Sequence, residues 1–317
     1  MVNLTYFFPS VADRVKNIEK MEGKKVLVTG ASGLIGNHVV ATLVDVGAEV
    51  HVFRNNNLPY VMKGVREFDF ISKGYDYLFH LAGYGQPRKF SENKFNTIAI
   101  NTNNLFELIS CLKDNGSILF ASTSELYSGL TVEATEDMIG TTTPAHPRAC
   151  YIESKRCGET IIHALNELNF NGKIARIALA YGPGVRYDDT RVSSDFIRMG
   201  LENKRIEPKG GLRNVRTYCF VTDTVTMLFN ILLNGKHTVY NVGGQSNLTI
   251  ARLALMIGDK LEAQVELTDL VGIDPSPKFV GISTDRYTKE FGAIKFIGIE
   301  KGLERTIEWF KYLQKEL

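Results

Sequence analysis

The sequence predicts an α/β protein, a doubly wound parallel sheet with a smaller C-terminal part. Two observations lead to this prediction. Apolar strand patterns alternate with amphipathic helix patterns from residue 24 to about residue 180, an order typical of β-α-β units. A glycine-rich turn joins the first of these strands to a helix. With 317 residues, the chain is long enough to build this core without disulfides or a metal.

Composition excludes several classes of function. Charged residues make up 23% of the chain and the formal net charge is +2, so we expect binding neither to nucleic acid nor to a membrane surface. The four cysteines have neither metal-type spacing nor the density of a disulfide framework: Cys111, Cys150, Cys157 and Cys219. The sequence has no apolar run near the ~20 residues of a membrane span and no export-signal pattern. We therefore expect a cytoplasmic protein without a metal site.

Residues 1–22 form an N-terminal extension ahead of the first strand. Val11, Val15 and Ile18 recur within it at helical spacing, after an aromatic cluster. This pattern predicts a short amphipathic helix that packs on the body of the protein. A role in binding a partner is the alternative.

The glycine-rich turn predicts a dinucleotide site. It follows the strand Lys24–Thr29 and leads into a helix that continues through Val39 and Leu43. Glycines let the backbone turn tightly and approach a pyrophosphate, whose charge is stabilised by the free N–H groups of a helix N-terminus. A plain tight turn is the alternative reading. The residues that we assign to this Rossmann-type cofactor site are Gly30, Gly33, Leu34, Ile35 and Gly36.

Two residues bear on the choice between NAD and NADP. An acidic residue that holds the adenosine ribose is expected after the strand Glu49–Phe53, but Arg54 stands there. A guanidinium suits a 2′-phosphate, so Arg54 favours NADP, and a surface arginine beside NAD is the alternative. Asp69 follows the strand Val65–Phe68 and is expected either at the adenine edge or in solvent.

The next strand opens into a loop of small residues. It spans Tyr77–Gly83, and its last residues Leu81, Ala82 and Gly83 suit a position under the cofactor diphosphate. His80 within this strand is expected to satisfy a backbone group rather than to catalyse.

A helix and a further strand follow. The helix is predicted from Phe95 to Ile109 and carries Asn101, and the strand Ser117–Ala121 leads into Thr123-Ser124-Glu125. Parallel sheets bind ligands beyond the carboxyl ends of their strands. We therefore expect the glycine turn, the loop at Gly83 and the Thr-Ser-Glu segment to converge.

Tyr151 and Lys155 have the spacing that makes them neighbours on one face of a helix. Free tyrosine ionises near pH ~10, so a tyrosine that acts as a base at neutral pH needs a positive neighbour, which Lys155 can supply. By itself this spacing is also common on ordinary amphipathic helices.

Beyond residue 180 the alternation of strands and helices loosens, and the glycine fingerprint is not repeated. We assign residues 23–180 to a dinucleotide-binding Rossmann domain that parts of 213–245 complete. Residues 181–317 are expected to form mainly a substrate-binding domain. The sequence contains no linker, repeat or low-complexity tract between the two.

Taken together, these segments resemble the extended short-chain dehydrogenases/reductases that modify nucleotide-diphosphate sugars, from about Lys24 to about Trp309. Within that group, Pro147–Tyr151 with Lys155, Arg156 and Glu159 most resembles UDP-glucuronate decarboxylases, as does Arg191-Val192 before Phe196-Ile197. The segment Ala121–Tyr127 is similar both to those enzymes and to GDP-mannose 4,6-dehydratases. Arg54 is similar to the arginine of GDP-mannose enzymes that use NADP.

The resemblance implies a chemical role for each catalytic residue. Tyr151 would take the proton of the sugar 4-hydroxyl while hydride passes from C4 to the nicotinamide, with Lys155 lowering the tyrosine pKa and holding the nicotinamide ribose. Thr123 would hydrogen-bond the same hydroxyl, and Glu125 would serve the proton step at C5. A carboxylate at C5 would leave as carbon dioxide, whereas a hydroxymethyl group would lead to loss of water.

The complete predicted site has three parts. The catalytic residues are Thr123, Glu125, Tyr151 and Lys155. The cofactor, NAD or NADP, is assigned to the glycine-turn residues, Arg54, Asp69, Leu81, Ala82, Gly83, Asn101, Tyr151, Lys155 and Ala178. The substrate, a nucleotide-diphosphate sugar, is assigned to Thr123, Ser124, Arg191 and Arg216.

Several alternatives stay open at this stage. Decarboxylation, 4,6-dehydration, 4-epimerisation and 4-dehydrogenation all begin at C4, and a non-catalytic dinucleotide-binding protein is a further possibility. Glu125 weighs against an epimerase, although it could instead cap the next segment or pair with a basic neighbour. Ser124 replaces the aspartic acid of dTDP-glucose dehydratases. Leu179 stands where relatives usually carry an asparagine, and leucine cannot make that residue's hydrogen bond to substrate.

A homodimer is also expected from the resemblance. The helices that contain Leu105–Ile109 and Tyr151–Leu165 would form its interface. Their apolar stripes could equally belong to the core of one subunit.

Overall fold

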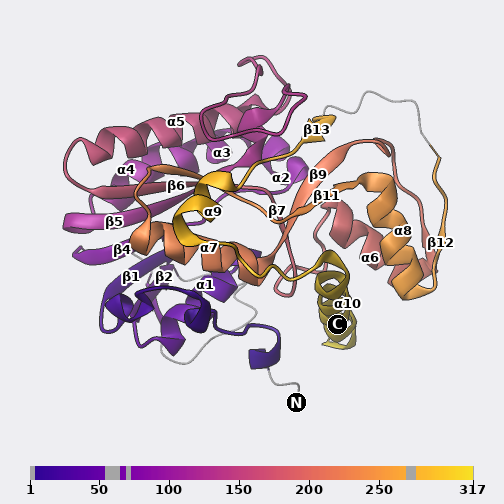
Figure 1. Ribbon diagram of the computed structural model, residues 1–317, viewed down its shortest axis with the longest axis horizontal. Helices are drawn as coiled ribbons and strands as arrows, with labels where there is room; N and C mark the ends of the chain where they lie inside the picture. Colours follow the sequence, from indigo (N-terminus) through magenta and orange to yellow (C-terminus); the bar gives the residue numbers. More distant parts are fainter. Residues whose placement is uncertain (1–3, 54–64, 69–72, 269–275, 317) are drawn as a thin grey trace.

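The computed structural model describes residues 4–53, 65–68, 73–268 and 276–316 (Figure 1). Within these residues, seven strands form one parallel sheet in the order β10-β6-β5-β4-β1-β2-β3. The α/β fold with a doubly wound parallel sheet is therefore confirmed. The strands are β1 (Lys25–Thr29), β2 (Glu49–Phe53), β3 (Val65–Phe68), β4 (Tyr75–His80), β5 (Leu112–Thr123), β6 (Asn171–Ile177) and β10 (Val239–Val242).

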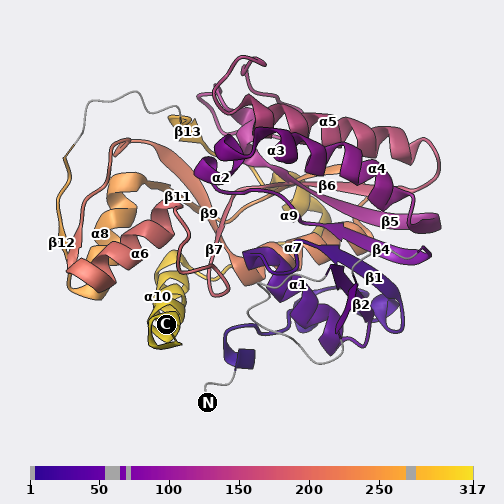
Figure 2. The same cartoon turned by 180° about the vertical axis from the view of Figure 1, so that it is seen from behind.

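Helices cover both faces of this sheet (Figures 1 and 2). One face carries α1 (Leu34–Asp45) and α7 (Val221–Asn234), and the other carries α3 (Lys94–Asn101), α4 (Asn103–Ile109) and α5 (Ala149–Asn166). Strands buried on both faces need nearly continuous apolar sequence, and Val26, Leu27 and Val28 of β1 are all buried. The short helix α2 (Pro87–Glu92) precedes α3.

The strand order reverses at β1, which pairs with β2 on one side and with β4 on the other. The chains that leave β1 and β4 therefore turn to opposite faces of the sheet and open a crevice beyond the two carboxyl ends. The glycine turn after β1 and the small-residue loop after β4 both lie at this crevice.

The C-terminal half builds a second, mixed sheet and then returns to the first. In the second sheet, β9 pairs antiparallel with β11 and parallel with β7 and β13. Helices α6, α8 and α10 lie beside it (Figure 2), while α7 and β10 rejoin the large sheet. The remaining elements are β7 (Leu179–Tyr181), α6 (Val192–Asn203), β8 (Arg205–Ile206), β9 (Val215–Phe220), β11 (Ser246–Thr249), α8 (Ile250–Leu261), β12 (Gln264–Val265), β13 (Phe279–Val280), α9 (Asp285–Phe291) and α10 (Ile299–Glu316).

The N-terminal extension packs on the body but is not the α-helix that its periodicity predicts. Three separate 3₁₀ turns span Leu4–Tyr6, Ala12–Arg14 and Ile18–Met21. The backbone leaves the helical region at Val15, which is extended, and at Asn17, which is left-handed at φ 58°. Val11 and Val15 are nevertheless buried, so tertiary packing and not a helical stripe explains the spacing of these apolar residues.

Aromatic side chains fix the extension in place. Phe7 packs edge-on against Trp309 of α10 at 5.0 Å, and Phe8 contacts both Trp309 and His38 of α1. The N-terminal residues thus join the helix after the glycine turn to the C-terminal helix.

The helix predicted from Phe95 to Ile109 is also two helices. Thr102, between α3 and α4, has φ −127° and ψ −86°, outside the helical region. The Thr102 hydroxyl donates to the Ile98 carbonyl at 2.9 Å, a local bond that competes with helix continuation.

A buried ion pair joins the large sheet to α5. Arg176 of β6 donates from Nε and Nη2 to the carboxylate of Glu159, and Ser122 of β5 donates to the same carboxylate at 2.5 Å. Both charged residues are 5% exposed. Arg176 also donates to the hydroxyl of Tyr127, which in turn donates to Asn241 of β10. One polar network therefore links β5, β6, β10 and α5 directly behind Thr123.

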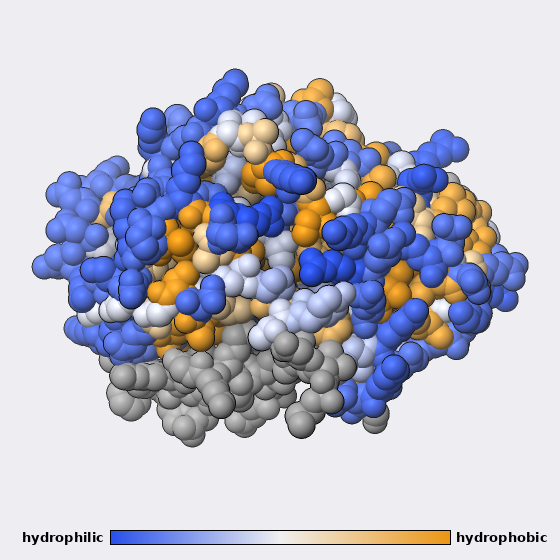
Figure 3. Space-filling view, turned by 60° about the horizontal axis from the view of Figure 1, so that its bottom comes forward, coloured by the Kyte–Doolittle hydropathy of each residue, from blue (hydrophilic) through white to orange (hydrophobic). Residues whose placement is uncertain are grey.

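The coloured part of the face in Figure 3 is mainly hydrophilic, with apolar side chains in separate patches. In the described part of the chain, no helix has the length and apolar character needed to cross a membrane. Among the described residues, there is no group of three His, Cys, Asp or Glu side chains that could hold a metal ion.

Removal of one partner of the buried ion pair should be strongly destabilising. Arg176→Leu leaves the Glu159 carboxylate buried with only a hydroxyl donor from Ser122, so we expect the free energy of unfolding to fall by about 3–5 kcal/mol. Urea denaturation at pH 7 measures this change. The control is Arg88→Leu, which breaks an exposed pair with Glu92 and should leave the unfolding midpoint unchanged. Equal stability of the two variants would contradict the prediction.

Candidate active site

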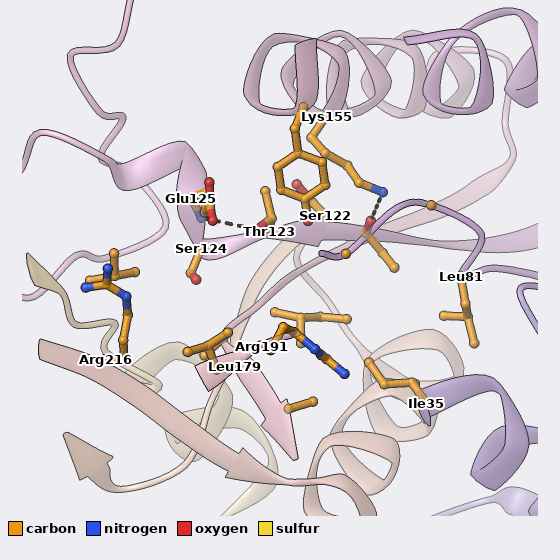
Figure 4. A pocket seen from close by; sticks show the side chains of 18 of the residues that line it. Ile35, Leu81, Ser122, Thr123, Ser124, Glu125, Lys155, Leu179, Arg191 and Arg216 are labelled. Atoms are coloured by element: carbon orange, nitrogen blue, oxygen red, sulfur yellow. Dashed lines mark hydrogen bonds between the residues drawn. The ribbon is translucent and has the colours of Figure 1, made fainter. Parts of the chain in front are cut away.

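A pocket of about 180 Å³ lies at the crevice, between the large sheet and the second sheet (Figure 4). Ile35 and Leu81 line one end, and Glu125 and Arg216 line the other (Figure 4). The sequence-predicted site residues among its lining are Ile35, Leu81, Ala82, Gly83, Thr123, Ser124, Glu125, Tyr151, Lys155, Ala178, Arg191 and Arg216. Ile35 and Arg216, which are more than 180 residues apart in the sequence, thus line the same cavity.

The glycine turn has the close backbone approach that a dinucleotide cradle requires. Gly30 has φ 71°, and a Cβ there would lie 2.7 Å from the carbonyl oxygen of Leu81. A Cβ on Gly36, in the first turn of α1, would lie 2.1 Å from the carbonyl oxygen of Gly30. Only glycine fits at these two positions, and α1 begins directly after Gly33 with its free N–H groups at the crevice. These residues fit a bound dinucleotide.

Asn101 and His80 are buried and do not line the pocket. Nδ2 of Asn101 donates to Ser154 of α5 at 3.0 Å and so joins α3 to α5. His80 is buried between the hydroxyl of Thr29 and the carbonyl of Ile100, and its burial lowers its pKa to about 3. Its position agrees with a structural role. Arg54 and Asp69 lie outside the described residues.

Tyr151 is partly buried beside Thr123. Its pKa is raised to about 12, mainly by burial and also by the charge of Glu125. A hydrogen bond with Thr123 and the charges of Arg148 and Arg191 act in the opposite direction. The positive charges that favour a phenolate therefore come from Arg148, directly before α5, and from Arg191, in a distant segment.

Lys155 is anchored to the strand that ends at the pocket. Its ammonium donates to the carbonyl of Ala121 at 2.7 Å and lies 4.8 Å from the centre of the Phe120 ring. Burial lowers the pKa of Lys155 to about 7, against the opposing charge of Glu159. Figure 4 shows the lysine reaching along the pocket wall towards the small-residue loop. This position suits contact with a cofactor ribose.

Glu125 follows Thr123 in a short 3₁₀ turn, Ser124–Tyr127. The Thr123 hydroxyl caps this turn by accepting from the Glu125 N–H at 3.2 Å. One carboxylate oxygen of Glu125 accepts from Nη2 of Arg148 at 2.5 Å, and the other is buried without a hydrogen-bond partner. Burial raises the pKa of Glu125, while the charges of Arg148 and Arg216 lower it. A carboxyl group with one uncommitted oxygen at a pocket is suited to proton transfer.

Two arginines bring positive charge to the pocket. Arg191 is held by the buried carboxylate of Asp189, which accepts from its Nη2 at 2.9 Å and also from Gln86 at 3.1 Å. Arg216 on β9 lies beside Glu125 at the far end of the cavity (Figure 4). Leu179 contributes an apolar wall close to Arg191 (Figure 4). Guanidinium groups that line a pocket suit a phosphate-bearing ligand.

Sequence reasoning gave no role to three residues of the site. Arg148 lies in the sequence motif directly before α5. A partly buried carboxylate such as Glu125 needs a cationic partner, and this requirement could have pointed to Arg148. Ser122 donates to the ion pair behind the pocket. Phe90 of α2 stacks on Tyr151, with ring centres 4.8 Å apart and planes 5° apart. Nothing in the sequence around Phe90 indicates this contact.

Comparison with known proteins defines the class. The chain matches the model of the NAD dependent epimerase/dehydratase family over residues 26–243, more than half of its length. It therefore belongs to this family of extended short-chain dehydrogenases/reductases, and the resemblance seen in the sequence is confirmed at that level.

Individual relatives support the same class. The chain is 27% identical to UDP-glucuronic acid decarboxylase 1 of Xenopus tropicalis, over 98% of this chain and 77% of that protein. Its fold is similar to an epimerase of Methanothermobacter thermautotrophicus, with a TM-score of 0.81, 20% identity, and coverage of 97% of this chain and 98% of that one. It is also similar to UDP-glucose 4-epimerase of Thermotoga maritima with UDP-glucose, with a TM-score of 0.79, 20% identity, and coverage of 92% and 99%.

The close approach at Gly36 can be tested by cofactor binding. Gly36→Ala places a methyl group against the Gly30 carbonyl, so we expect affinity for NADH or NADPH to fall by about tenfold or more, equivalent to about 1.4 kcal/mol. Fluorescence titration of the purified protein measures it. Gly298→Ala is the matched control because its added Cβ meets no atom within 4 Å. A folded Gly36→Ala protein with wild-type affinity would show that the turn does not cradle the dinucleotide.

Proposed function

We propose that this protein oxidises C4 of a nucleotide-diphosphate sugar with bound NAD or NADP, acts at C5, and then returns the hydride, as a UDP-glucuronate decarboxylase does. The observation that carries this proposal is the convergence of Thr123, Tyr151, Lys155 and Glu125 on one pocket beside the glycine turn. Similarity to a UDP-glucuronic acid decarboxylase over almost the whole chain supports it.

The cofactor site is formed at the crevice. The N-terminus of α1 and the glycine turn would hold the diphosphate, with the loop Leu81–Gly83 beside it, and Lys155 and Tyr151 would contact the nicotinamide half. Bound NAD or NADP supplies a hydride acceptor that becomes the hydride donor at the end of the cycle. Arg54 favours NADP, and identifying the nucleotide released from the denatured protein distinguishes the two.

Tyr151 serves the step at C4. Its hydroxyl group and that of Thr123 bind the sugar 4-hydroxyl, and Tyr151 takes the proton as the C4 ketone forms. The arginines near Tyr151 favour the phenolate that this step requires. Tyr151 returns the proton to the same oxygen when the ketone is reduced, so the residue ends the cycle unchanged.

Glu125 serves the step at C5. A C4 ketone makes the C5 carboxylate of glucuronate a β-keto acid, which loses carbon dioxide and leaves an enolate. The raised pKa of Glu125, caused by burial, lets its buried carboxyl group carry a proton to C5 and regain one from solvent. Arg191 and Arg216 bind the diphosphate and so fix the sugar in the pocket.

A dehydratase is the second candidate, because the uncommitted oxygen of Glu125 can equally accept a C5 proton. Leu179 in place of the usual asparagine indicates a substrate pose that differs from that of the relatives. In a 4-epimerase or 4-dehydrogenase, Glu125 would have no proton to transfer at C5. In a non-catalytic dinucleotide-binding protein, neither Glu125 nor Tyr151 would transfer a proton.

Product analysis tests the proposal. We expect the purified protein to convert UDP-glucuronate with loss of carbon dioxide, which mass spectrometry of the nucleotide sugar detects. Loss of water from GDP-mannose would instead establish the dehydratase. Tyr151→Phe should retain its cofactor and lose turnover by at least about 100-fold, because the proton acceptor at C4 is removed.

The matched control is Tyr84→Phe, which removes a hydroxyl group next to the cofactor loop from a residue without a proposed proton step. Unchanged product formation by Tyr151→Phe would rule out the mechanism. Recovery of both substrates with unaltered mass from the wild-type protein would turn the search to epimerisation and to other sugars.

A homodimer formed through α3, α4 and α5 is a further part of the proposal. Leu105 and Leu108 of α4 are buried in the subunit core, so they do not form the predicted interface. Helices α3 and α4 expose other large apolar side chains, Phe95 at 88%, Phe106 at 60% and Ile98 at 41%. A second copy of the chain would remove these side chains from water.

Phe106→Glu should prevent this association, because it places a charge in an apolar interface. Light scattering after size-exclusion chromatography should give twice the chain mass for the wild-type protein and a single chain mass for the variant. Leu255→Glu on α8 is the control and should leave the mass unchanged, since Leu255 is 43% exposed on a different part of the molecule. A Phe106→Glu dimer would show that the interface lies elsewhere.

A further inference from the structure

Four side chains from three segments form one connected unit at the pocket. Arg148, immediately before α5, donates to Glu125 at 2.5 Å. The Arg148 guanidinium carbon also lies over the Phe90 ring, 5.3 Å from its centre. Tyr151 stacks on the same ring at 4.8 Å. Glu125, Arg148, Phe90 and Tyr151 therefore contact one another in series.

The unit has little freedom to rearrange. Phe90 is 1% exposed and Arg148 is 8% exposed, so neither side chain can swing into solvent without a change in packing. The planar guanidinium bonds a carboxylate and stacks on a ring at the same time, a combination that a lysine ammonium cannot reproduce. The Phe90 carbonyl also accepts from the thiol of Cys150 at 3.6 Å, which ties α2 to the start of α5.

The contact gives the two oxygens of Glu125 different environments. Oε1 is committed to Arg148, whereas Oε2 is buried without a hydrogen-bond partner. Arg216 from β9 and His146 from the loop before α5 also act on this carboxyl group, and Tyr151 faces it from α5. Arg148 is the residue among these that makes a direct hydrogen bond to it, and so the one that fixes its orientation.

We propose that Arg148 is a positioning residue that sets the geometry of both chemical steps, by fixing Glu125 through an ion pair and Tyr151 through the shared ring of Phe90. This inference rests on the proposed reaction at C4 and C5. A rigid unit keeps the group that serves C4 at a constant separation from the group that serves C5. One placement of the sugar then suffices for both steps.

Arg148 exchanges no proton in this scheme. Tyr151 holds the proton of the 4-hydroxyl and returns it to the same oxygen. Glu125 gives a proton to C5 after carbon dioxide has left and regains one from solvent. The arginine orients the carboxyl group and its charge lowers the pKa of Glu125, and its removal leaves the partly buried Glu125 without its hydrogen-bonding cation.

The test compares Arg148→Met and Arg148→Lys with the wild-type protein. Arg88→Met is the control, because it removes the same charge from the exposed side of α2, the helix that carries Phe90. The measurements are the bound-cofactor content, the pH profile of product formation from UDP-glucuronate, and the fraction of product released as the 4-ketone. In infrared spectra, the carboxyl band of Glu125 is identified as the band that the Glu125→Gln variant lacks. Titration of this band gives the pKa of Glu125 and does not require turnover.

We expect all three variants to retain cofactor. Arg148→Met should raise the pKa of Glu125, because an opposite charge within hydrogen-bonding distance is lost. It should also slow product formation by about tenfold or more and release more 4-ketone, since a misplaced Glu125 fails at C5. Arg148→Lys should recover part of the rate, because it restores the charge without the flat stacking group.

A rate, pH profile and Glu125 titration in Arg148→Met equal to those of Arg88→Met would overturn the inference. If the wild-type protein transforms no nucleotide sugar, the proposed function fails, and the infrared titration still decides the role of Arg148. In that case an upward shift in the pKa of Glu125 supports the positioning role, and an unshifted titration refutes it.

Discussion

The structure depends on the buried ion pair between Glu159 and Arg176, because it connects the helix that carries Tyr151 to the strands that end at the pocket. Ser122 donates to this pair, and the next residue, Thr123, faces the cavity. Such a pair costs desolvation energy that an apolar pair of the same size would avoid. We infer that the ion pair fixes the position of α5 along the sheet. Glu159 can bind Arg176 and Ser122 together only in one position of α5 relative to β5 and β6.

A second constraint acts at the crevice between β1 and β4. The reversal of strand order opens this space, and the backbone approach of Gly30 to Leu81 sets its width. The second sheet closes the opposite wall with Leu179 and Arg216 from β7 and β9. The chain then returns through α7 and β10 to the large sheet, so the walls of the pocket cannot separate without disturbing the sheet itself.

Burial controls the electrostatics of the pocket. It raises the pKa of Tyr151 to about 12 and lowers that of Lys155 to about 7, so each side chain is shifted towards its neutral form. The arginines oppose this effect. Arg148 and Arg191 act on the phenol, and Arg148 and Arg216 act on Glu125. The charge on which the proposed reaction depends is therefore supplied by guanidinium groups, which remain protonated even when buried.

The sequence by itself determined the sheet, the glycine turn and the identity of most pocket residues, because strand and helix periodicity and the steric needs of a tight turn are local properties. It also contained the carboxylate, the tyrosine and the lysine. Only the tertiary structure decided their partners. Lys155 bonds the Ala121 carbonyl, Glu125 pairs with Arg148, and Asn101 joins two helices. The apolar residues of the N-terminal extension likewise follow the surface that they cover and not a helical period. These outcomes depend on contacts between segments far apart in the chain, where burial and hydrogen-bond geometry outweigh the preferences of neighbouring residues.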